Sequence, residues 1–403
     1  MFGTPESNTG ILERKEEPPR APEADEGGSF FNDPNLVELS LDEGGLLPEV
    51  EERHQELSRQ FRARVHQILG WLDASGVNRH EWSHMRRVAN GVQALGGLFA
   101  QYHDSHEVEA AIQGTAVHDI GYDTHGRDPR ELSKAGGHYD DHPIIGANLF
   151  QEALDAKNLR PDWWEEDKER FDAIAMDSIL YHSNGSDYAR YWDHREQGST
   201  TWSDVLRMYA RFIDKIDNTE KRVYPRHMEE LGESLGISRA IIRTQMKANK
   251  DILDALPREV GKRMRAVSTR ERFLLQSGDR DPEEAFERLR EIDDRFTHRL
   301  VPYAITGQHL IYSPKAHKLG VVYDVDVDRV GSVLGIQYTP DHHFAHFRDA
   351  YGFSSMPRAA DVTRRIRSLL EKRDVDPQEK TFSVFLNYGN SGIREAEFCA
   401  HVD

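Results

Sequence analysis

The chain has 403 residues, enough for two or three domains with a large buried core. Lys and Arg number 52 against 70 Asp and Glu, and the net charge of −18 repels a phosphate backbone, so we expect no extended nucleic-acid partner. No apolar run approaches the roughly 18 residues of a membrane helix and no signal segment opens the chain, which predicts a soluble, cytoplasmic protein without a membrane partner. The single cysteine, Cys399, excludes internal disulfides and thiolate zinc sites, so any metal is expected on histidine and carboxylate side chains.

Residues 1–48 are rich in Glu, Pro, Gly and Asp and show no sustained apolar period. A segment of this composition buries too little apolar surface to offset its chain entropy. We therefore expect a disordered acidic tail. The stretch from Phe30 to Leu47 carries several large apolar residues, and the alternative for it is an extended strap docked on the folded part.

Residues 49–300 carry apolar residues at intervals of three and four, which is the period of an α-helix. Phe61, Val65, Ile68 and Leu72 form one such series. Glycines and prolines interrupt the pattern repeatedly. This region is therefore predicted to be one all-helical domain.

Residues 301–403 change to a period of two, typical of strands, as in LGVVYDVDV and TFSVFLNY. A helical stripe of Val362, Ile366 and Leu369 lies before the last predicted strand. We predict a small C-terminal α/β domain with a regulatory or oligomerising role. The whole chain is thus expected to be α+β, and the sequence leaves open whether it forms a homo-oligomer.

Several segments of the helical region place a potential metal ligand beside inward-facing apolar residues. These ligands are His84, His118 with Asp119, His142, His182 and Asp214. Burying such groups unpaired is costly, and a shared divalent cation removes that cost. Neighbours on a helix point about 100° apart, so His118 can face one cation while Asp119 bridges to a second. The sequence thus predicts two divalent transition-metal ions, for which Mn, Fe, Ni and Zn suit N/O ligands.

The order of these residues, H…HD…H…H…D, resembles the dinuclear branch of the HD superfamily of metal-dependent phosphohydrolases. The segments RRVA, DIG and FIDKID around the ligands are also similar to that family, and the resemblance covers roughly residues 60–225. It implies an HD-type helical bundle. It also implies hydrolysis of a phosphate monoester or diester, in a nucleotide or a small phosphorylated metabolite, by a metal-activated water with Asp119 as the bridging catalytic ligand.

Further residues are candidates for catalysis or substrate binding. His80 lies one helical turn before the first ligand and is a candidate proton donor, with an exposed first-turn histidine as the alternative. The family resemblance makes Lys215 a phosphate-contacting cation, and the alternative is a surface ion pair. The loop residues Arg127, Lys134 and His138 are candidates for substrate contacts, against the alternative of solvated loop charges.

Two other function classes fit the same residues. Myo-inositol oxygenase and its phosphonate-cleaving relatives are similar to the HD family in fold and ligands but hold two irons, so an HD-fold di-iron oxygenase is one alternative. A non-catalytic nucleotide-sensing module is the other. Outside the helical region, His342, His343 and His346 also have metal-ligand spacing, but no carboxylate partner is evident for them.

Overall fold

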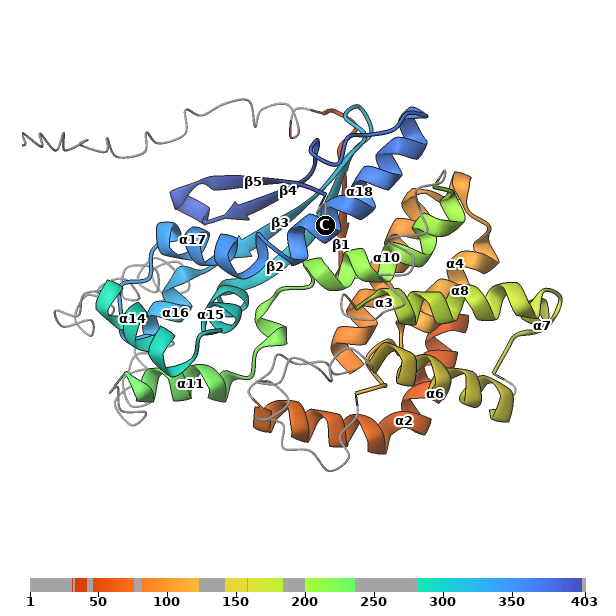
Figure 1. Cartoon of the computed structure of the whole chain (residues 1–403), viewed down its shortest axis with the longest axis horizontal. Coiled ribbons are helices and arrows are strands. Elements are labelled where there is room, and N and C mark those ends of the chain that lie inside the picture. The colour runs from red at the N-terminus through yellow and green to blue at the C-terminus, as the bar shows by residue number, and fades with distance from the viewer. Residues whose placement is uncertain are drawn as a thin grey trace, which may run out of the picture.

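The structure is a computed structural model, and it describes residues 31, 33–41, 46–75, 82–122, 142–157, 159–183, 200–235 and 282–400. Within these ranges the chain is α+β, as predicted: helices form its first part, and a five-stranded sheet with further helices forms its C-terminal part (Figure 1). Among the described helices, none combines the length and hydropathy that crossing a membrane requires.

The helical part contains helices with the predicted apolar stripes. They are α2 (Pro48–Ser75), α3 (Trp82–Leu98), α4 (Ser105–Thr115), α6 (His142–Lys157), α7 (Asp162–Glu165), α8 (Lys168–Tyr181), α10 (Trp202–Ile216) and α11 (Pro225–Ser234). Helix α10 buries Tyr209, Phe212 and Ile216 at intervals of three and four. Thr201 and Asp204 form a capping box that starts it. Because α10 packs against α3, α4 and α8, it forms the middle of this part.

The sheet has the order β1-β2-β3-β4-β5. Its strands are β1 (Val37–Ser40), β2 (Ile305–Ser313), β3 (Lys318–Val325), β4 (Lys380–Asn387) and β5 (Ile393–Cys399). Only the β3–β4 pair is parallel, so the chain needs a crossover there. The crossover consists of α16 (Val327–Leu334), α17 (Pro340–Tyr351) and α18 (Ser355–Glu371), and α14 (Pro282–Ile292) and α15 (Thr297–Ala304) precede the sheet.

The expected disorder of residues 1–48 is wrong for residues 33–41, which include β1 at the edge of the sheet. Leu39 lies opposite Leu310 of β2, and Leu41 is fully buried. The Asp33 carboxylate accepts a hydrogen bond from the Ser313 hydroxyl at 2.5 Å. Apolar burial and strand pairing together offset the chain entropy of this short segment. Residues 33–41 therefore form the extended strap, docked on the folded part, that was the alternative to disorder. Residues 1–30 lie outside the described residues.

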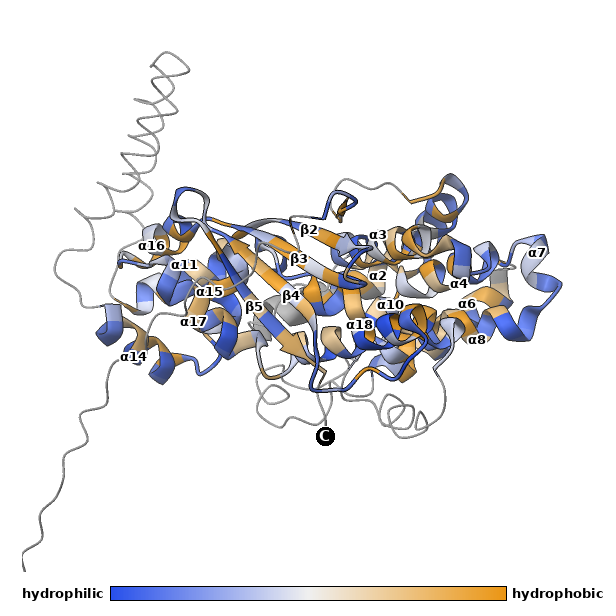
Figure 2. Cartoon of the chain, turned by 90° about the horizontal axis from the view of Figure 1, so that it is seen from above, coloured by the Kyte–Doolittle hydropathy of each residue, from blue (hydrophilic) through white to orange (hydrophobic). Residues whose placement is uncertain are grey.

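The helical part and the sheet share one hydrophobic core. Phe212 of α10 packs edge-to-face on Phe382 of β4, with ring centroids 5.6 Å apart. Helix α18 contacts both α10 and strand β4 (Figure 1). Figure 2 shows apolar residues gathered along the central strands β3 and β4. The predicted boundary between residues 300 and 301 falls inside α15, which runs directly into β2.

Candidate metal centre

All six predicted ligands come together in the interior of the helical part. His84 lies in α3, His118 and Asp119 lie in the turn after α4, and His142 begins α6. His182 caps the end of α8, and Asp214 lies in the last turn of α10. The four histidines and Asp119 are buried and Asp214 is nearly so. Segments far apart in the sequence thus converge on one point.

The first cluster consists of His84, His118, Asp214 and one oxygen of Asp119. The Nε2 atoms of His84 and His118 are 3.3 Å apart. Asp119 Oδ2 lies 3.4 Å from His84 Nε2 and 3.3 Å from His118 Nε2. Asp214 Oδ1 lies 3.2 Å from His84 Nε2. Four potential ligand atoms therefore surround one position.

The second cluster uses the other oxygen of the same carboxylate. Asp119 Oδ1 lies 3.3 Å from His182 Nε2 and 3.6 Å from His142 Nε2, and these two nitrogens are 2.8 Å apart. The Asp119 carboxylate consequently stands between the two clusters with one oxygen directed at each. This is the arrangement expected of a bridging ligand.

The hydrogen bonds behind the histidine rings leave Nε2 facing the clusters. His118 Nδ1 lies 2.8 Å from the Thr115 carbonyl oxygen, and His182 Nδ1 lies 2.5 Å from the Ile179 carbonyl oxygen. His84 Nδ1 lies 2.6 Å from the Asp217 carboxylate. A carbonyl oxygen requires the ring nitrogen to donate, so Nδ1 carries the proton in His118 and His182. His84 Nδ1 also lies 2.6 Å from Arg222 Nη1, so this ring is held between a carboxylate and a guanidinium. Such contacts orient histidine ligands in metal sites.

The spacing of the first cluster fits a cation. A metal that binds two ligands at 2.0–2.1 Å holds them about 3.0 Å apart in octahedral geometry and about 3.4 Å apart in tetrahedral geometry. The separations in the first cluster are 3.2–3.4 Å. The groups that bring their ligand atoms within 4.8 Å of one another are His84 with His118 and Asp214, and His118 with Asp119 and His182. These buried His/Asp clusters can hold metal ions.

No family model matches this chain, and neither do any curated proteins or solved structures.

Two glycines allow the ligand-bearing segments to approach. A Cβ on Gly121 would collide with the His142 carbonyl oxygen and with Gly146 of α6. A Cβ on Gly114 would collide with the backbone of Ala175, where α4 crosses α8. Both contacts bring Asp119 within reach of the histidines on α6 and α8. The Gly121 contact gives a packing reason for the glycine of the DIG segment.

Sequence reasoning missed Asp217, a fully buried carboxylate next to the first cluster. Besides its contact with His84, it accepts hydrogen bonds from Arg87 Nε at 3.1 Å and Arg87 Nη2 at 3.0 Å. A signal was present, because Asp217 follows Asp214 by three residues and ends the FIDKID segment. Arg222, whose Nη1 lies 2.9 Å from His84 Nε2 and 3.5 Å from Asp214 Oδ1, had no sequence signal.

The Asp214 carboxylate of the first cluster is held in its ionised form. Burial would raise the pKa of Asp214, but Lys215, His84 and Arg222 outweigh it and hold this pKa well below its usual value. Burial and Arg222 would lower the pKa of His84, yet hydrogen bonds to three surrounding carboxylates raise it to about 9. In the metal-free chain a proton on His84 thus takes the place that a cation would occupy among these carboxylates.

Of the other residues predicted to take part in catalysis or substrate binding, only Lys215 lies in the part of the chain that the structure describes. Lys215 Nζ lies 2.6 Å from Asp214 Oδ2, so this cation forms an ion pair with a candidate ligand at the edge of the cluster. His80 and the loop residues Arg127, Lys134 and His138 lie outside the described residues.

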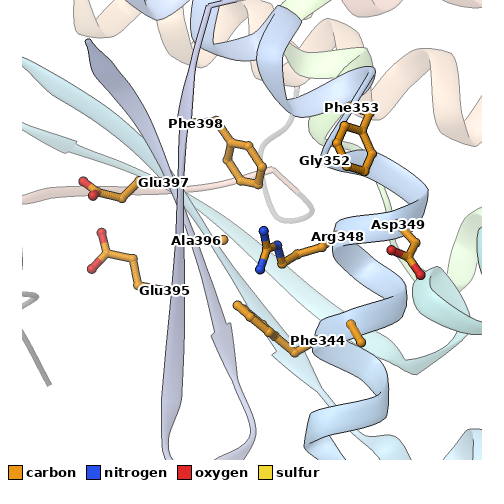
Figure 3. Close-up of a pocket in the computed structure, with 10 residues that line it drawn as sticks. Phe344, Arg348, Asp349, Gly352, Phe353, Glu395, Ala396, Glu397 and Phe398 are labelled. Carbon is orange, nitrogen blue, oxygen red and sulfur yellow. The ribbon is translucent and has the colours of Figure 1, made fainter. Parts of the chain in front are cut away.

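A groove of about 600 Å³ lies elsewhere, between α17 and β5 (Figure 3). Phe344 and Arg348 line it on the helix, Phe353 lines it in the turn after the helix, and Ala396 and Phe398 line it on the strand. Its lining includes none of the six ligands. The groove is therefore a feature of the sheet and is separate from the metal centre.

Proposed function

We propose that this chain is a metal-dependent phosphohydrolase with an HD-type dinuclear centre. Its substrate would be a phosphate monoester or diester in a nucleotide or a small phosphorylated metabolite. The observation that carries the proposal is the position of Asp119, whose two oxygens face two separate histidine clusters. The order of the six ligands along the chain supports the same conclusion.

His84, His118, Asp214 and Asp119 would hold one cation, and His142, His182 and Asp119 would hold the other. Nitrogen and carboxylate ligands of this kind suit Mn²⁺, Fe²⁺, Ni²⁺ or Zn²⁺. Two such cations supply a water of lowered pKa and neutralise the charge that develops on phosphoryl oxygens.

The chain's own residues add positive charge and orientation. Arg222 Nη1 lies beside Asp214 at the first cluster, so its guanidinium is placed to contact a phosphoryl oxygen bound there. Lys215 screens the outer oxygen of Asp214. Tyr122 stacks on His142 with ring centroids 4.2 Å apart and holds that ring in position.

Substitution of the bridging and non-bridging ligands tests the proposal. Asp119→Ala should lose both metals and hydrolysis, because the Asp119 carboxylate serves both clusters. His182→Ala should lose about half of the bound metal, because His182 belongs to the second cluster only. Elemental analysis of protein purified without chelators and assays with aryl phosphate esters and a nucleotide panel measure both effects. Asp172→Ala is the control, since Asp172 is a carboxylate of α8 that bonds Arg160 and Trp164 instead of the centre.

The outcomes separate the proposed function from its alternatives. Close to two Mn, Ni or Zn ions per chain together with phosphate release would support it. Bound iron with oxygen uptake and no phosphate release would replace it with the oxygenase. Nucleotide binding without any turnover would replace it with a sensing module. Hydrolysis retained by Asp119→Ala would contradict it outright.

A further inference from the structure

The Asp217 carboxylate connects the metal centre to the C-terminal sheet. Its Oδ2 atom lies 2.6 Å from His84 Nδ1, on the side of that ring away from the centre. Its Oδ1 atom accepts a hydrogen bond at 3.2 Å from Gln308 Nε2, which belongs to β2. A residue 91 positions away in the chain thus touches the carboxylate that orients a candidate metal ligand.

The Gln308 side chain is buried, and among the described residues its one hydrogen bond is to Asp217. Its exposed fraction is 1%, and it lies on the face of β2 that contributes Leu310 and Tyr312 to the core. Its Oε1 atom has no hydrogen-bond partner among the described residues. Leaving a buried carbonyl oxygen unpaired costs more free energy than a typical net hydrogen bond contributes. An apolar residue of similar size would therefore serve the fold at least as well.

A second contact from the sheet reaches the same segment. Tyr323 of β3 lies directly opposite Gln308 in the β2–β3 pairing. Its hydroxyl donates a hydrogen bond at 2.7 Å to the carbonyl oxygen of Ile216, the residue before Asp217. One cross-strand pair thus holds both the backbone and the side chain at the end of α10.

We propose that Gln308 is a positioning residue of the metal centre, which fixes Asp217 so that the His84 ring keeps Nε2 directed at the first cluster. Tyr323 assists by fixing the backbone at Ile216. The C-terminal sheet is on this view a structural part of the centre. This inference rests on the metal centre of the proposed function, but it does not depend on the reaction that the centre performs.

The test uses Co²⁺ as the probe in the full-length chain. In Gln308→Met we expect Co²⁺ to be lost to a chelator about 10 times faster than in the wild type, at the low end of the roughly 10- to 100-fold loss of metal affinity that follows removal of a group bonded to a ligand itself. The visible absorption of bound Co²⁺ should shift, because His84 is no longer held in one orientation. The thermal midpoint of the metal-free variant should stay equal or rise, since the unpaired amide is gone.

Two further variants keep the test specific. Tyr323→Phe should accelerate Co²⁺ loss in the same direction with a smaller factor. Thr381→Val removes another buried polar group of the sheet, one that bonds Thr363 and the Ala360 carbonyl oxygen, and should leave Co²⁺ loss unchanged.

Each result decides the question. A wild-type release rate and spectrum in Gln308→Met would overturn the positioning role while leaving the proposed function intact. Equal acceleration in Thr381→Val would also overturn it, because the effect would then come from general loosening of the sheet. A wild-type chain that binds no Co²⁺ would overturn both this inference and the proposed function.

Discussion

At the residue scale, the histidines of the centre differ from His343, another buried histidine. Those of the centre direct Nε2 at other ligand atoms, as the 3.3 Å separation of His84 and His118 shows. His343 on α17 instead has both ring nitrogens bonded within the protein, to the Tyr388 hydroxyl at 2.9 Å and the Val301 carbonyl oxygen at 3.2 Å. A histidine satisfied in this way needs no metal, although its spacing in the sequence resembled a metal motif.

The buried His343 ring should make stability depend on pH. Burial lowers the pKa of His343 to about 3, whereas the same imidazole in the unfolded chain has its ordinary pKa of about 6.5. Between these values the unfolded state binds a proton that the folded state does not, so stability is full above about pH 6.5 and falls as the pH is lowered. Replacing this residue, as in His343→Gln, should therefore reduce the loss of stability between pH 7 and pH 4.5.

Urea unfolding of the metal-free chain at the two pH values measures this difference. His317→Asn is the control, because the His317 side chain is 36% exposed, and its pH dependence should match the wild type. An unchanged pH dependence in His343→Gln would show that this ring is not kept neutral by burial.

At the element scale, the approach of the α4 turn to α6 decides whether one carboxylate can serve both clusters. Gly121 lies against the His142 carbonyl oxygen, so the turn that carries His118 and Asp119 touches the first residue of α6. Asp119 Oδ1 then lies 3.6 Å from His142 Nε2. A wider separation of these two elements would leave the second cluster without its shared oxygen.

A methyl group at this contact should break the centre. Gly121→Ala places Cβ against backbone atoms of α6, so we expect about 1–3 kcal/mol of destabilisation and loss of metal from the second cluster. The matched control is Gly97→Ala in α3, where an added Cβ meets no atom within 4 Å. This substitution should stabilise the helix by roughly 0.5–1 kcal/mol, because alanine favours the helical backbone over glycine. Metal content and denaturant unfolding test both changes, and full metal content in Gly121→Ala would refute the packing argument.

At the scale of the whole molecule, the shared core makes the sheet and the helical part depend on each other. Phe212 and Phe382 pack together across the junction, and helix α18 contacts both α10 and β4. The hydrogen bonds from Gln308 and Tyr323 add polar links near the centre. We therefore expect the two parts to unfold in one cooperative transition.

The tryptophans allow this to be measured, because all six lie from Trp71 to Trp202 in the sequence, between the described strands β1 and β2. Phe382→Ala removes a large side chain of β4 from the shared core and leaves a cavity there, which should destabilise the chain by about 3–5 kcal/mol. The tryptophan fluorescence transition should shift by the full amount, although the substitution is in the sheet. Ile393→Ala on the same sheet is the control, since Ile393 is 55% exposed. A tryptophan transition that Phe382→Ala leaves in place would mean that the two parts unfold independently.

The sequence by itself determined the α+β class and the residues that meet at the centre. Apolar periods of three to four and of two are local properties, so they predict helices and strands without knowledge of the fold. The six ligands were identifiable because buried histidines and carboxylates beside apolar residues require a common partner. Their order and neighbouring segments supplied the resemblance to the HD superfamily.

Only the tertiary structure decided which oxygen of Asp119 faces which cluster. It also decided that Asp217 and Arg222 contact the first cluster and that Gln308 bonds Asp217. These contacts join segments far apart in the chain, and no local pattern encodes such distances. The ordering of residues 33–41 was decided in the same way, since β1 is stable only through its pairing with β2. Long-range packing therefore sets the geometry of the centre, while local patterns set which residues can take part in it.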